Sequence, residues 1–136
     1  MSKKIIRFLL LLVIVAVFYY SWLPDPNMRS ENYLPQWLLN WSNENFNVRT
    51  AIPFVVFGYL LEAYSFKKNS QNKNVDRKFV FIRNLGVSAV VVIIAECGQF
   101  LIKNRSPDFM DIYFGIIGSL VGAFGYNLFN KKLRNA

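Results

Sequence analysis

The chain has 136 residues, of which 54% are apolar and 17% aromatic, so it is long enough for one compact domain and too apolar to be disordered. Only 18% are charged, against about 25% in ordinary soluble domains, and they cluster between long uncharged runs. The basic residues behind the net charge of +8 are therefore interpreted as the flanks of membrane spans rather than as a nucleic-acid-binding surface. The absence of His excludes Ser-His and Cys-His nucleophile pairs and most zinc sites, and we expect no metal and no other cofactor.

Four stretches approach the roughly 20 apolar residues that a helix needs to cross a bilayer core. The first ends in Tyr19, Tyr20 and Trp22 rather than in a signal-peptide cleavage site, so we expect it to be a retained helix. Pro53 falls in the first turn of the second, where proline is tolerated. The predicted transmembrane spans are residues 5–23, 50–66, 79–102 and 111–130.

The distribution of basic residues predicts the orientation of these spans. Most Lys and Arg residues outside the spans lie in the N-terminus, the 67–78 loop and the C-terminal tail, and the other two connections hold Arg29, Arg49, Lys103 and Arg105. The positive-inside rule then places both termini in the cytoplasm. We therefore expect a single all-α domain over residues 1–136, a four-helix antiparallel bundle that is multi-pass in a bacterial cytoplasmic (inner) membrane.

The connection between the first two spans has its own helical pattern. Leu34, Trp37, Leu38 and Trp41 recur at helical spacing, which is typical of an amphipathic segment on a membrane surface. We expect this segment to lie along the outer face of the membrane. An aromatic-anchored connector is the simpler interpretation, and a lid over a ligand is the alternative.

A group of polar residues is expected at the outer end of the third and fourth spans. Glu96 and Gln99 are three residues apart and so share one face of a helix. A buried ionisable group in a membrane requires a partner, and the short turn that follows supplies Arg105, Asp108 and Asp111. These five residues form the predicted ligand-binding cluster, with Glu96 and Asp111 as the candidates for any acid/base chemistry.

Glycines follow Asp111 along one stripe of the fourth span. Such stripes allow close helix packing, and we expect this one to pack against the 79–102 span; its members are Gly115, Gly118, Gly122 and Gly125. Ser106 is the expected N-cap of this helix. At the opposite end of the bundle, Glu62 and Arg83 are expected to form a structural ion pair near the inner boundary.

The polar residues and glycines also resemble the signature of the VanZ-like family of bacterial membrane proteins. That signature reads E-x-x-Q, an Arg in a short loop, then D-x-x-x-N-x-x-G-x-x-x-G, and the matching positions are Glu96, Gln99, Arg105, Asp111, Gly118 and Gly122. Gly115 stands where the family has Asn, and the His near the start of the second span is missing. The resemblance implies a role in resistance to teicoplanin, a lipoglycopeptide antibiotic.

Three functions are compatible with these features. The sequence favours a non-enzymatic membrane protein whose outer cluster engages an amphiphile: a lipoglycopeptide, a membrane lipid headgroup or a lipid-linked envelope precursor, in resistance or envelope maintenance. The second is a membrane-embedded enzyme that uses Glu96 and Asp111 as an acid/base pair. The third is a structural subunit of a homo-oligomer or larger membrane complex, whose polar network serves only packing.

Overall fold

The computed structural model describes residues 1–70 and 75–135, with side chains as far as residue 131. Over this part of the chain the regular elements are all helices, which confirms that the domain is all-α. Three of them, α1, α4 and α5, are long and apolar enough to cross a membrane by length and composition; α3 is not among these. The helices are α1 (Lys3–Ser21), α2 (Gln36–Glu44), α3 (Phe46–Asn69), α4 (Arg77–Gln99) and α5 (Phe109–Asn135).

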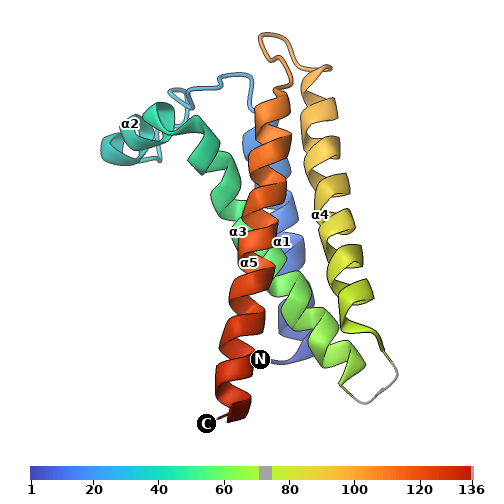
Figure 1. Ribbon diagram of the computed structural model, residues 1–136. Helices are drawn as coiled ribbons and strands as arrows, with labels where there is room; N and C mark the ends of the chain where they lie inside the picture. The colour runs from blue at the N-terminus through green and yellow to red at the C-terminus, as the bar shows by residue number, and fades with distance from the viewer. Residues whose placement is uncertain (71–74, 136) are drawn as a thin grey trace.

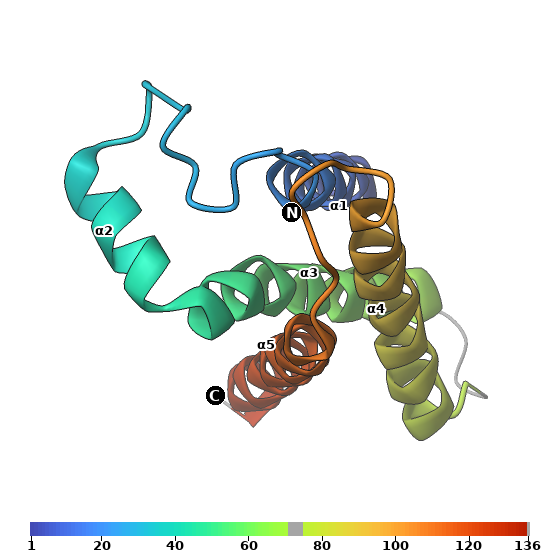
Figure 2. The ribbon, with the colours of Figure 1, turned by 90° about the horizontal axis from the view of Figure 1, so that it is seen from above.

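The four long helices run side by side in alternating directions (Figure 1). The two ends of the chain lie at the same end of the molecule, and the short α2 lies at the opposite end. Seen from above, α3 passes between α1 and α5 (Figure 2). Helix α3 also contacts α4, so it is the one helix that touches every other helix of the fold.

The faces of α1 are those of a helix in an apolar solvent. Its buried residues, Ile6, Leu10 and Val17, recur at helical spacing and join the core. Its opposite face is also apolar, with Leu11 63% and Val15 66% exposed. A helix that is apolar all round is typical of a membrane span, because lipid requires no polar face.

The closest helix contact in the fold is between α3 and α5. A Cβ atom added to Gly118 would overlap the carbonyl group of Ala51, and one added to Gly122 would overlap that of Val55. The α5 backbone therefore lies directly against the α3 backbone, which is the approach that small residues at four-residue spacing permit. Across the same interface, the Ser119 hydroxyl donates a hydrogen bond to the carbonyl oxygen of Phe54 at 3.3 Å.

The glycine stripe has a different partner from the one that the sequence predicts. Gly118 and Gly122 face α3 rather than the 79–102 segment, and only Gly115 lies near that segment, where an added Cβ would be 2.7 Å from Val92 Cγ2. No atom lies within 4 Å of a Cβ placed on Gly125. Spacing along a sequence identifies the face of a helix that packs closely but not the helix that it packs against.

Two predicted helix starts are also wrong by a few residues. Helix α3 begins at Phe46, so Pro53 lies inside the helix and not in its first turn, and it removes one backbone donor there. Helix α5 begins at Phe109, and its cap is Asp108, whose carboxylate accepts a hydrogen bond from the backbone N–H of Met110 at 2.9 Å. Ser106 lies outside this helix.

Replacing single glycines tests the α3–α5 contact. We expect Gly122→Ala to lower the free energy of unfolding by about 1–3 kcal/mol, because the added methyl group must push two backbones apart. The measurement is an unfolding titration in mixed micelles of a mild detergent and dodecyl sulfate, followed by helical circular dichroism.

The matched control is Gly125→Ala, one helical turn away in open space. It should cost nothing and could raise stability by up to about 1 kcal/mol through the higher helix propensity of alanine. Equal losses from the two substitutions would contradict the close contact.

Candidate functional site

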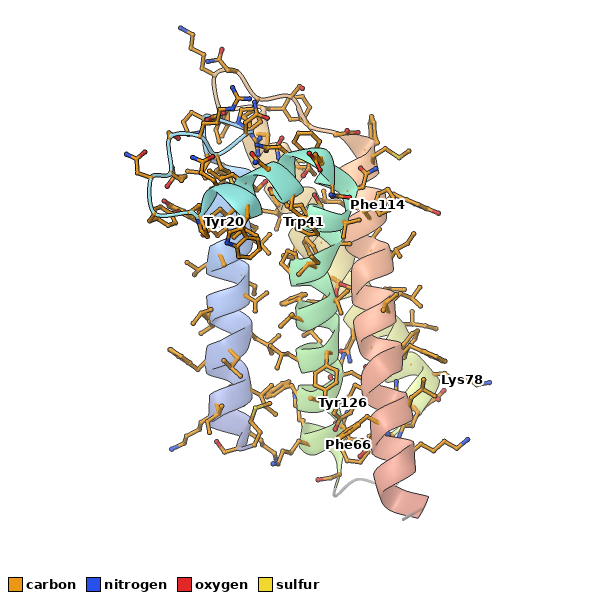
Figure 3. The ribbon with its side chains drawn as sticks, turned by 90° about the vertical axis from the view of Figure 1, so that its left-hand side faces the viewer. Tyr20, Trp41, Phe66, Lys78, Phe114 and Tyr126 are labelled. Carbon is orange, nitrogen blue, oxygen red and sulfur yellow. The ribbon has the colours of Figure 1, made fainter. Side chains whose placement is uncertain are left out.

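A cavity of about 430 Å³ lies at the end of the molecule that carries α2, and residues of all five helices line it. Figure 3 shows Tyr20 of α1 and Trp41 of α2 at this end, and both are part of the lining. The greater part of the wall is apolar; it includes Val17, Leu38, Leu39, Phe54, Val92 and Ala95. An apolar cavity with a few converging polar groups is the usual form of a small-molecule site.

The polar end of the cavity is built around Glu96, which is only 4% exposed. Its Oε2 atom accepts a hydrogen bond from the backbone N–H of Asp108 at 3.1 Å, and its Oε1 atom accepts one from the Gln99 side-chain amide at 3.3 Å. The Glu96 carboxylate, in the last turn of α4, is thus hydrogen-bonded to the turn that leads into α5. The spacing of Glu96 and Gln99 places both in the cavity wall.

The end of α1 is attached to the end of α4 beside this group. The Gln99 amide donates to the Ser21 hydroxyl at 3.0 Å, and the Trp22 indole N–H donates to the carbonyl oxygen of Ala95 at 3.0 Å. An added Cβ at Gly98 would collide with the Trp22 ring, so glycine is what allows the indole to lie against α4. Trp22 is therefore a structural contact between helices as well as an aromatic residue near the interface.

The other predicted site residues divide between the cavity and the helix cap. Arg105 and Asp111 line the cavity together with Glu96 and Gln99. Arg105 donates to the carbonyl oxygen of Ser21 at 2.7 Å, and Asp111 accepts from the Thr50 hydroxyl at 2.8 Å. Asp108 is outside the cavity lining, since its carboxylate caps α5.

Arg49 is a charged residue of the cavity lining that the predicted cluster omits. It lies in the first turn of α3 and donates to the carbonyl oxygen of Pro26 at 3.1 Å and to the Ser42 hydroxyl at 3.3 Å. It lines the cavity together with Arg105, although 56 residues separate them in the chain. Its only signal in the sequence is a charged residue beside the first residue of a predicted span.

The polar group around Glu62 is arranged differently from the predicted ion pair of Glu62 and Arg83. Glu62 is buried and accepts hydrogen bonds from the side-chain amides of Asn84 at 2.7 Å and Asn127 at 3.3 Å. Arg83 donates instead to the Ser65 hydroxyl at 3.1 Å. The sequence prediction omits the two asparagines, which supply neutral donors to the buried carboxylate of Glu62.

In the same region, the rings of Phe66 and Tyr126, labelled in Figure 3, meet edge to face, with centroids 6.1 Å apart.

A hydrogen-bonded turn covers the cavity where Arg49 reaches it. The Asp25 carboxylate accepts from the backbone N–H groups of Asn27 at 2.9 Å and Arg29 at 2.7 Å, and Met28 adopts a positive φ of 52°. These N–H groups stabilise the ionised form, which lowers the pKa of Asp25 below its usual 3.8. The turn carries Pro26, whose carbonyl oxygen accepts from Arg49.

Metal-ligating side chains are not grouped anywhere in the described residues: no three of Cys, Asp and Glu lie close enough together to hold an ion.

Apolar helices with the length of membrane spans, and a cavity whose polar groups gather at one end of them, define an all-helical membrane protein with an internal site. The sequence model of one family, VanZ/LLP1, matches residues 5–130. The chain therefore belongs to the VanZ/LLP1 family, which confirms the resemblance found in the sequence. No curated protein and no solved structure matches the chain.

The pH dependence of the Asp25 turn is a direct test of its geometry. Because the pKa of Asp25 is lower in the folded protein, the stabilising contribution is complete above pH 3.8 and is lost as the pH falls through the folded pKa. We expect the hydrogen-exchange protection factors of the Asn27 and Arg29 amides to be constant from pH 8 to 5 and to fall below pH 4.

Asp25→Asn should lower the same protection factors at every pH, because its one side-chain oxygen replaces the two that accept these N–H groups. The control is Asp76→Asn, where one side-chain oxygen accepts from the Lys78 N–H at the start of α4 and the amide oxygen of Asn can keep this contact. A decline in protection between pH 8 and 5 in the unmodified protein would contradict the assignment.

Proposed function

We propose that α3 is a fourth transmembrane span, with α1, α4 and α5 as the other three. Its 24 residues extend over about 36 Å at 1.5 Å per residue, enough for a bilayer core of about 30 Å. The other long helices surround it, so it needs less apolar surface than a helix that faces lipid. Its most polar interior residue, Glu62, is buried and hydrogen-bonded, as a membrane interior requires.

The end of the molecule that carries the two chain termini faces the cytoplasm in this proposal. Basic residues of α1 and α3 gather there, namely Lys3, Lys4, Arg7, Lys67 and Lys68, which is the pattern of a cytoplasmic boundary. The cavity then opens at the outer leaflet of the inner membrane. Helix α2 lies at the outer interface, where Trp37, 71% exposed, is suited to the lipid headgroup region.

The function that the geometry supports best is the non-enzymatic binding of an amphiphile from the outer leaflet. One observation carries it: an apolar cavity of about 430 Å³ ends in Glu96, Gln99, Arg105 and Asp111. An acyl chain matches the apolar walls, and the polar head of the same molecule matches the hydrogen-bonding groups. Membrane lipids and lipid-linked envelope precursors have this form.

The lipoglycopeptide teicoplanin has this form too, since it carries an acyl chain on a polar peptide. Binding of its chain in the cavity would hold the antibiotic away from its target at the cell surface. We therefore propose a role in teicoplanin resistance for this member of the family, with envelope maintenance through a lipid ligand as the related possibility at the same site.

Filling the cavity tests this function. We expect the unmodified protein to raise the concentration of teicoplanin that inhibits a sensitive Gram-positive host, and Leu38→Trp to abolish the protection because the indole occupies the space of the chain. Membrane levels of each variant are matched by immunoblot, and purified proteins are compared for binding of teicoplanin and of deacylated teicoplanin.

Leu12→Trp is the matched control, because Leu12 is 52% exposed on α1 and lies outside the cavity lining. It should protect as well as the unmodified protein. Full protection by Leu38→Trp, or equal binding of the acylated and deacylated antibiotic, would contradict a chain-binding cavity.

A further inference from the structure

The polar end of the cavity has an excess of hydrogen-bond donors. The Nε atom of Arg105 is buried and has no hydrogen-bond partner within the described part of the chain. A buried donor without an acceptor is costly, and the cost is larger when the donor is charged. The chain therefore satisfies the guanidinium group of Arg105 only in part, and Arg105 is one of the residues that line the cavity.

Two arginines from different parts of the fold line this cavity. Arg105 comes from the turn between α4 and α5, and Arg49 comes from the first turn of α3; both line the cavity. Each is anchored through one Nη atom to a backbone carbonyl oxygen, of Ser21 for Arg105 and of Pro26 for Arg49. Anchoring fixes the two guanidinium groups and leaves their other N–H groups for a ligand.

The acidic residues of the cavity accept hydrogen bonds from groups other than the two arginines. Both oxygens of Glu96 already accept, from the Asp108 N–H and from Gln99, and Asp111 accepts from Thr50. The recorded partners of Arg49 and Arg105 are carbonyl and hydroxyl oxygens, which carry no charge. In the described residues, neither guanidinium group is thus hydrogen-bonded to a carboxylate, although Glu96 and Asp111 line the same cavity.

We propose that the polar end of the cavity is an oxyanion site, in which Arg49 and Arg105 together bind the phosphate or carboxylate of an anionic amphiphile. The planar guanidinium group presents paired N–H donors that match the oxygens of either anion. The inference rests on the proposed function, because the acyl chain of the same molecule occupies the apolar walls. It defines the class of ligand by its head: an oxyanion and not a neutral or solely cationic group.

Ligands that share one acyl chain and differ in the head test this inference. The full-length protein, purified in a neutral detergent, is titrated with oleoyl lysophosphatidate, oleate and 1-oleoylglycerol, and with glycerol 3-phosphate, which has no chain. We expect at least one of the two anionic oleoyl probes to bind tenfold or more tightly than oleoylglycerol, and the comparison of the two identifies phosphate or carboxylate as the preferred head. Glycerol 3-phosphate should bind far more weakly than the lysophosphatidate.

Variants then assign the preference to the arginines. Arg49→Gln and Arg105→Gln should each weaken binding of the preferred anionic probe about tenfold and leave oleoylglycerol binding unchanged. Lys103→Gln is the matched control, because it removes one positive charge from the exposed part of the same turn as Arg105. It should leave all affinities unchanged.

The outcomes separate the two proposals. Equal affinity for oleoylglycerol and both anionic probes would overturn the oxyanion site and leave the amphiphile cavity standing. Failure of every oleoyl probe to bind would overturn the proposed function, and tight binding of glycerol 3-phosphate would do the same because the chain would contribute nothing. Should an arginine variant fail to fold, the comparison of heads on the unmodified protein still decides the inference.

Discussion

The contact between the backbones of α3 and α5 is the constraint on which the remainder of the structure depends. Gly118 and Gly122 bring α5 against the carbonyl groups of Ala51 and Val55, and no residue with a Cβ fits at either position without moving a helix. This contact sets the register between the two helices, and the register places Thr50 beside Asp111 at 2.8 Å. Thr50 and Asp111 are both part of the cavity lining.

The same central position explains the polar residues of α3. A helix enclosed by others can carry hydrogen-bonded charges that a lipid-facing helix cannot, and α3 carries Arg49 toward one end and Glu62 toward the other. The hydrogen-bond partners of both side chains are neutral groups: carbonyl and hydroxyl oxygens for one Nη atom of the arginine, and carboxamides for the glutamate. The polar clusters at the two ends of the molecule therefore have different partners, and the cluster with Arg49 adjoins the apolar cavity.

The sequence predicts those features that depend on local spacing. Glu96 and Gln99 share a helix face because they are three residues apart, and the glycines form a stripe for the same reason. Helical periodicity does not predict contacts between segments that are distant in the sequence. Three such features are the helix that packs against the glycine stripe, the hydrogen bond between Glu62 and Asn84, and the shared cavity of Arg49 and Arg105. The predicted span of residues 50–66 is shorter than α3 because hydropathy scores the preference of each residue for an apolar environment. The polar first turns and the basic last turn of α3 have low hydropathy.

The central claim is that the cavity at the α2 end holds the chain of an amphiphile, and photolabelling tests it most directly. A fatty acid with a diazirine near the end of its chain is added to the protein in lipid bilayers, irradiated, and the labelled residues are identified by mass spectrometry. The account predicts labels at Leu38, Leu39 and Phe54 that unlabelled oleate displaces. Labels confined to outward residues such as Leu11 and Val15, without displacement, would contradict it.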